Sequence, residues 1–154
     1  MATWQFDLFL IARDEAVPEA SGDSLETPGL PLQLAIEIQQ ALMQVFAPPW
    51  FMLEDWLVFG AEQGTRADLL FFDDDTMEVM LRLDASIDNG PVVAMACELA
   101  RRLDCRLFDP GSRCCIEPQP ERVLQAIASS RAARFVSNPR GFLAQLSPSR
   151  QAGQ

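Results

Sequence analysis

The sequence contains no histidine, no tyrosine and no lysine, and all twelve of its basic residues are arginine. Without an imidazole, the chain lacks the base of Ser-His-Asp and Cys-His catalysis and the commonest side-chain metal ligand. Without lysine, it has neither a Schiff-base nucleophile nor the lysine of a P-loop. Its eight glycines never form a G-x-G phosphate loop. The enzymatic routes that remain are carboxylate, thiol or serine chemistry, or the use of a bound cofactor. We expect that the protein has no cofactor and is not an enzyme.

Long apolar runs are also missing, because no stretch approaches 18 apolar residues, and a membrane-spanning helix needs about 20. The start of the chain, residues 1–7, has no basic region of the kind that opens a signal peptide. The spacing of the four cysteines lacks the paired knuckles of a zinc site, so we expect no metal. Buried thiols in a reducing cytoplasm are the favoured interpretation. A redox-active pair at Cys114 and Cys115 is the alternative.

Charge is unevenly distributed along the 154 residues. The net charge is −10, and residues 1–81 hold 15 acids against two arginines, whereas residues 82–154 hold seven acids and ten arginines. An acidic surface repels nucleic acid and anionic membranes and attracts basic partners. The acidic half is therefore either a solubilising surface or a docking face for a basic protein, and we expect neither nucleic acid nor membrane as a partner.

Apolar periodicity predicts one α+β domain over residues 1–130 and a helical C-terminal arm with a frayed end over 131–154. We expect strands at 4–12, 56–61, 67–72, 77–84, 105–108 and 114–116, a long loop at 13–30, and helices beginning at 31, at 88–91 and at 120. The fold class is a two-layer sandwich with an antiparallel sheet and helices on one face. The order β-α-β-β-β-α-β plus C-terminal helices suggests a ferredoxin-like variant.

Two acidic segments are candidates for binding. The triplet Asp73–Asp75 is typical of a hairpin turn, and a cation site is the less favoured alternative because the EF-hand spacing fails. Glu54 and Asp55 lie beside Trp50 and Trp56, which either anchor a protein interface or close the end of the core. The candidate partner-binding residues are Asp14, Glu15, Trp50, Glu54, Asp55, Trp56, Asp73, Asp74 and Asp75.

Three features together resemble a known group of proteins. They are the opening strand W-Q-F-D-L-F-L-I, the acidic and aromatic middle from Trp50 to Phe72, and the helix that runs into L-A-R-R-L-D-C-R-L-F-D-P-G-S at 99–112. They resemble small acidic bacterial α+β proteins that serve as cognate immunity proteins of polymorphic and type VI secretion toxins. The resemblance covers about residues 1–118.

The resemblance implies a cytoplasmic, non-enzymatic protein that binds a cognate toxin or effector, one with a basic surface, and blocks it. An acidic face would raise the rate of such an association. Two alternatives stay open. One is a small-molecule sensor or regulatory module that works as a ferredoxin-like homodimer, and the other is an enzyme that uses carboxylates or the two adjacent cysteines.

Overall fold

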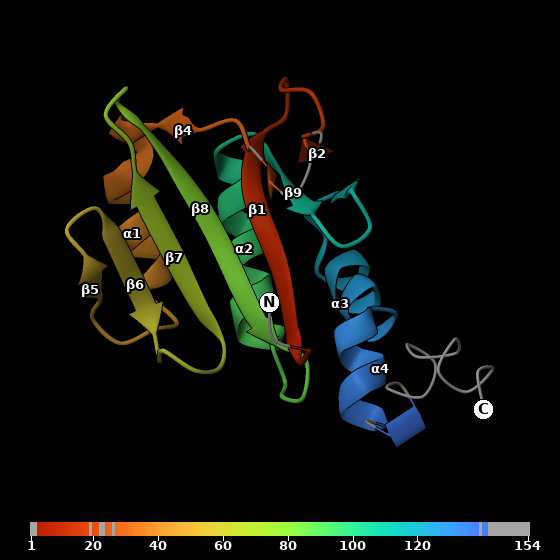
Figure 1. Ribbon diagram of the computed structural model, residues 1–154. Coiled ribbons are helices and arrows are strands. Elements are labelled where there is room, and N and C mark those ends of the chain that lie inside the picture. The colour runs from red at the N-terminus through yellow and green to blue at the C-terminus, as the bar shows by residue number, and fades with distance from the viewer. Residues whose placement is uncertain (1–2, 19, 22–23, 26, 139, 142–154) are drawn as a thin grey trace.

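A computed structural model describes residues 3–18, 20–21, 24–25, 27–138 and 140–141 (Figure 1). Its main sheet has eight strands in the order β10-β9-β1-β8-β7-β6-β5, with β4 paired to β8, and every pairing is antiparallel. The strands are β1 Gln5–Ala12, β4 Leu30–Pro31, β5 Trp50–Leu53, β6 Trp56–Gly60, β7 Arg66–Phe71, β8 Thr76–Asp84, β9 Cys105–Asp109 and β10 Cys114–Ile116. The fold is therefore α+β with an antiparallel sheet, as the sequence predicted, and the sheet is open.

Helices α1 (Ala35–Leu42) and α2 (Gly90–Arg102) lie together on one face of this sheet (Figure 1). Alternation along β1 turns Phe6, Leu8 and Leu10 toward the helices, and all three are buried in the main core. Ile38 and Leu42 of α1 enter the same core. Burying each such side chain stabilises the fold by about 1.5–3 kcal/mol. No helix of the described chain covers the other face (Figure 1).

The start of the first helix differs from the prediction. Pro31 belongs to β4 instead of a helical first turn, and a 3-10 helix, Leu32–Leu34, precedes α1. The physical reason is a competing pairing, since the Leu32 N–H donates to the Asp75 carbonyl (3.0 Å) and holds this segment against β8. The expected loop at 13–30 likewise contains three short strands, which are β2 Ala20–Ser21, β3 Ser24–Leu25 and the start of β4.

The strand order also differs from the expected one, because β5 was not predicted and lies at the sheet edge. Its sequence, Trp-Phe-Met-Leu, has no polar alternation to indicate a half-buried strand. A two-residue turn at Glu54 and Asp55 folds β5 back on β6.

Helices α3 (Pro120–Ala128) and α4 (Arg131–Ser137) extend the helical layer beyond α2. Val123 and Ile127 of α3 are buried, whereas Leu124 is exposed because it points away from the face that these two positions, four apart, turn to the core. The predicted arm beyond residue 141 lies outside the described residues. Among the described helices, none is both long and apolar enough to cross a bilayer.

Candidate functional site

The meander β5-β6-β7-β8 brings two acidic turns to one end of the sheet. Successive antiparallel strands reverse direction, so the β5–β6 turn and the β7–β8 turn share that end. A hydrogen bond from the Phe71 N–H to the Asp55 carbonyl (2.9 Å) joins the two turns. The five carboxylates on them are all exposed: Glu54, Asp55, Asp73, Asp74 and Asp75.

The three aspartates of the β7–β8 turn have different roles. The Asp74 carboxylate accepts hydrogen bonds from the backbone and hydroxyl of Thr76 and so closes the turn. Asp75 has φ +61°, a left-handed conformation that aspartate tolerates better than most residues. Asp73 makes no side-chain hydrogen bond or ion pair within the described chain, and its charge is fully available. In the described residues, no group of three or more Cys, Asp or Glu could hold a metal ion.

The edge strand adds apolar area beside these charges. Phe51 is 66% exposed and Leu53 is 60% exposed on β5, and Phe72 is 44% exposed next to the second turn. β5 pairs with β6 on one side and with no described strand on the other. We call this region the edge surface, and it consists of Phe51, Leu53, Glu54, Asp55, Phe72, Asp73, Asp74 and Asp75.

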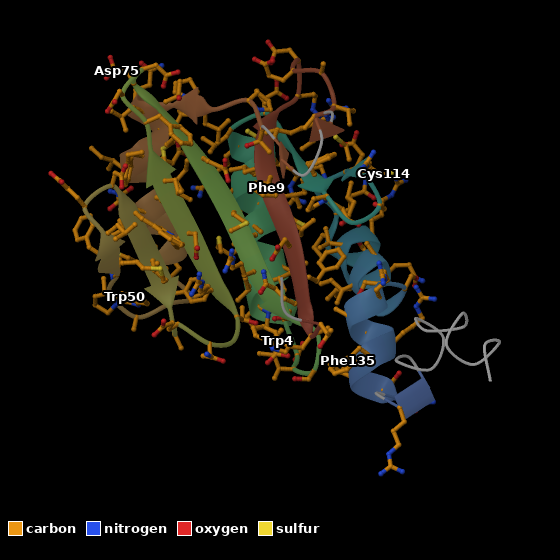
Figure 2. All side chains as sticks on the ribbon, in the orientation of Figure 1. Trp4, Phe9, Trp50, Asp75, Cys114 and Phe135 are labelled. Carbon is orange, nitrogen blue, oxygen red and sulfur yellow. The ribbon has the colours of Figure 1, made fainter. Side chains whose placement is uncertain are left out.

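Trp50 and Trp56 are half-buried on the face of the sheet that α1 and α2 do not cover, and each indole N–H is bonded. Trp50 Nε1 donates to the Gly60 carbonyl (2.8 Å), and Trp56 Nε1 donates to Asp68 Oδ2 (3.0 Å). Neither residue is part of the main core, so of the two alternatives the one in which they close the end of that core does not hold. The first bond fastens β5 to β6 and the second fastens β6 to β7. Trp50 lies at the end of the sheet opposite to Asp75 (Figure 2).

A buried ionic cluster on the same face was not predicted. Asp68 is 0% exposed. Its Oδ2 accepts a hydrogen bond from Arg66 Nη2 (3.1 Å), and its Oδ1 forms an ion pair with Arg66 Nε (2.9 Å). Arg82 Nε lies 3.9 Å from Oδ2. Arg66 and Asp68 are two apart on β7, and Arg66 pairs with Arg82 on β8. Residues two apart on a strand share a face of the sheet, and so do directly paired residues of neighbouring strands. The alignment of β7 with β8 would therefore have placed these three side chains on one face. Because this cluster neutralises Asp68, the free negative charge of the region is concentrated in the edge surface.

Asp14 and Glu15 lie elsewhere. They follow β1, which is separated from β5 by β8, β7 and β6. Both side chains are exposed, and their segment is held on the β9 side by Arg13, which bonds Glu117 (2.9 and 3.0 Å), and by Arg106, which donates to the Glu15 carbonyl. The structure therefore groups seven of the nine candidate residues around β5 and the two turns and leaves Asp14 and Glu15 out of that group.

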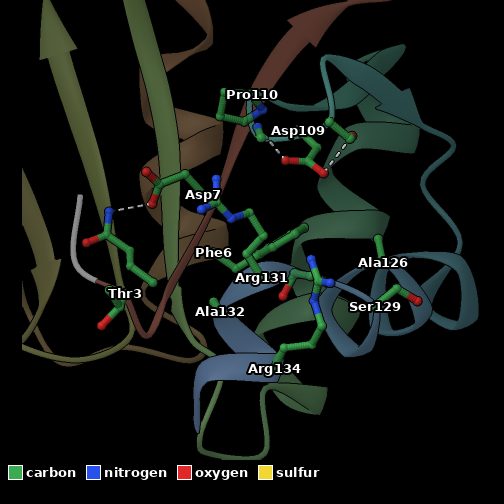
Figure 3. Close-up of a pocket in the computed structure, with 14 residues that line it drawn as sticks. Thr3, Phe6, Asp7, Asp109, Pro110, Ala126, Ser129, Arg131, Ala132 and Arg134 are labelled. Carbon is green, nitrogen blue, oxygen red and sulfur yellow. Dashed lines mark hydrogen bonds between the residues drawn. The ribbon is translucent and has the colours of Figure 1, made fainter. Parts of the chain in front are cut away.

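A cavity of about 650 Å³ opens between β1 and the helices α3 and α4 (Figure 3). Asp7, 7% exposed, lines it and accepts a hydrogen bond from Gln5 Nε2 at its Oδ1 (2.6 Å). Burial raises the pKa of Asp7, because the charged form loses solvation there. Arg131 and Arg134 line the cavity from α4.

The cysteines fit the buried-thiol interpretation in part. Cys97 and Cys105 are buried, and desolvation raises the pKa of each thiol to about 11. Cys114 is exposed and Cys115 is half-buried on β10, and burial also raises the pKa of Cys115. A raised pKa disfavours the nucleophilic thiolate, so the structure gives no activated thiol at these three positions.

Comparisons of the chain with protein-family models, with curated proteins and with solved structures find no match.

Proposed function

We propose that this chain is a binding protein that docks a basic protein partner through the edge surface. The observation that carries the proposal is the coincidence of three features at one place: two exposed acidic turns, exposed aromatic and aliphatic side chains, and an edge strand with no second neighbour among the described strands. Apolar anchors inside a polar rim are the usual composition of a protein interface. Complementary charge would accelerate the encounter.

The distribution of exposed apolar residues supports the location. Among the described residues nine large apolar side chains are exposed, and six of them lie in the segment 32–72, three in the edge surface and three on or next to α1. They are Leu32, Ile36, Met43, Phe51, Leu53 and Phe72. Such residues occur singly on many proteins, but a concentration on one side of the molecule marks an interaction site.

We propose further that the partner is a toxin and that this chain is its cytoplasmic immunity protein, in keeping with the sequence resemblance. An immunity protein needs affinity and no catalysis, and the described site offers charge and contact area without an activated nucleophile. An enzyme of carboxylate chemistry would need converging acids in a cleft, and the acids of the edge surface lie on open turns. We also propose that the core β9-β1-β8-β7 with α1 and α2 is a ferredoxin-like unit extended by β5 and β6.

The test compares capture of the partner by charge-reversed variants of the tagged protein from its source cells. Glu54→Arg with Asp55→Arg reverses two charges of the edge surface at positions without side-chain bonds. Asp74 and Asp75 are avoided, because they shape their turn. We expect this double variant to capture the partner about tenfold less at low salt, a loss in the range that electrostatic steering explains.

The matched control is Glu62→Arg with Glu98→Arg, which makes the same change of net charge at exposed positions outside the edge surface. It should capture the partner as the unmodified chain does. The captured protein is then expressed alone and together with each variant. Toxicity that the unmodified chain relieves and the Glu54→Arg/Asp55→Arg variant does not would support both proposals. Equal capture by the two double variants would contradict docking at the edge surface, and a captured protein that is harmless alone would contradict the immunity function.

A further inference from the structure

The cavity between β1 and the C-terminal helices is remote from the edge surface, because β8, β7 and β6 separate β1 from β5. The cavity exists because β9 pairs with only the second half of β1. Pairing of these strands begins at Phe9 with Phe108, and the chain turns away after Asp109. Along residues 5–8, β1 therefore has no strand on this side among the described residues. Helices α3 and α4 close the gap and complete the cavity walls (Figure 3).

The gap leaves a strip of main chain facing the cavity. The Trp4 carbonyl accepts from Ala85 at the end of β8, and the Arg13 N–H donates to Asp104 next to β9. Backbone groups of consecutive residues alternate between the two neighbours of an antiparallel strand. Gln5 and Asp7, like Arg13, therefore turn their N–H and C=O groups toward the missing neighbour. An extended ligand can pair with this edge as a short strand would.

The side chains that line the cavity include both acidic and basic groups. Asp7 is nine-tenths buried, and its Oδ2 has no hydrogen-bond partner in the described chain, since Gln5 donates to Oδ1. Arg134 and Arg131 are three apart on α4 and thus lie on one face of it, and both extend from the helix at the cavity (Figure 3). Asp109 also lines the cavity, but its oxygens already accept from Gly111 and Ser112 (2.9 and 2.8 Å).

We propose that this cavity binds a ligand with an α-carboxylate next to an N–H donor, the chemistry shared by a peptide C-terminus and a free amino acid. The carboxylate lies against the Arg134 guanidinium group of α4, where planar, charge-assisted hydrogen bonds favour arginine. The N–H groups reach the Asp7 carboxylate and the free main-chain edge of β1. Phe6, Pro110 and Ala132 supply apolar walls for a small aliphatic side chain. The volume is in the range of about 300–1,000 Å³ that is usual for ligand sites.

The test is a titration of the full ¹⁵N-labelled chain, followed by amide chemical shifts in two-dimensional NMR, which detects weak binding. Three probes are used: the tripeptide Ala-Ala-Leu as the free acid, the same tripeptide with a C-terminal amide, and leucine. We expect saturable shifts for the free acids at Gln5, Asp7, Gly111 and residues 129–134. The C-terminal amide should bind at least fivefold more weakly, because it lacks the charge that Arg134 recognises.

Arg134→Gln should weaken binding of the free-acid tripeptide by about fivefold to tenfold, and Arg122→Gln is the control. Arg122 is exposed on α3 and does not line the cavity, so its variant should bind as the unmodified chain does. Tighter binding of the tripeptide than of leucine identifies a peptide C-terminus as the source, and the reverse identifies a free amino acid. Absence of saturable shifts at the cavity with either free acid would overturn the proposal. Equal affinity for the acid and the amide would do the same. Neither result bears on capture at the edge surface.

Discussion

Carboxylates in this chain occupy three different environments, and each environment gives them a different role. Asp73 is exposed and unbonded, so it contributes charge. Asp68 is fully buried and is held by Arg66, so it contributes structure. Asp7 is buried, Gln5 is its one hydrogen-bond partner among the described residues, and its ionised form is poorly solvated. Counting acids in the sequence predicts the net charge but cannot distinguish these roles, because burial depends on strand pairing.

Asp7 provides a prediction about pH. Its pKa in the folded protein is raised above the ordinary 3.8 by desolvation. Between the unfolded pKa and the folded pKa, the folded state therefore binds more protons than the unfolded state does. Its contribution to stability is therefore present in full below the unfolded pKa and is lost as the pH rises through the folded pKa. Asp7→Asn removes this loss, which amounts to about 1.4 kcal/mol for each unit of pKa elevation.

The free energy of unfolding of Asp7→Asn and of the unmodified chain is measured by urea denaturation between about pH 4 and about pH 7. The variant should gain stability relative to the unmodified chain as the pH rises. Glu78, whose pKa is also raised by burial, should give the same sign when replaced by Gln. A stability difference between Asp7→Asn and the unmodified chain that is constant with pH, or that moves in the other direction, would contradict the account of Asp7.

At the scale of the elements, two indole hydrogen bonds attach the edge of the sheet to its centre. Trp50 bonds a main-chain carbonyl of β6, whereas Trp56 bonds the buried carboxylate of β7. Most elements could be predicted from the sequence. The alternation of apolar residues in β1 and β8 has the period of a strand, and the apolar repeat in α2 has the period of a helix. β5 and β4 could not be predicted in this way. They are short, and they are strands only because β6 and β8 lie beside them.

Trp50→Phe and Trp56→Phe should therefore destabilise the fold by different amounts. A neutral hydrogen bond contributes about 0.5–1.5 kcal/mol, and one to a charged group contributes about 1.5–3 kcal/mol. Trp56→Phe should cost more, since it also leaves an oxygen of the buried Asp68 with fewer donors. Denaturant titrations of the two variants test this. An equal or larger loss for Trp50→Phe would mean that the Asp68 cluster does not depend on the indole.

At the scale of the whole molecule, the two lateral halves of the sheet have different properties. The half that ends at β5 is acidic and exposes apolar groups at the turns beside β5. The half that contains β1 holds the cavity between β1 and the arginines of α4. The sequence indicated an acidic first half and an arginine-rich second half. It did not indicate that Glu54 and Asp55 would lie at the same end of the sheet as Asp73, because that arrangement depends on the meander that pairs β5, β6, β7 and β8.

The most direct test of docking at the edge surface is amide hydrogen exchange of the chain, measured by mass spectrometry with and without its captured partner. Binding should slow exchange in residues 50–56 and 71–76, where the edge strand and the two acidic turns lie. Residues 90–102 of α2 should exchange at the same rate in both states. Protection confined to other segments, with 50–56 and 71–76 unchanged at saturating partner, would contradict the proposal that the edge surface is the binding site.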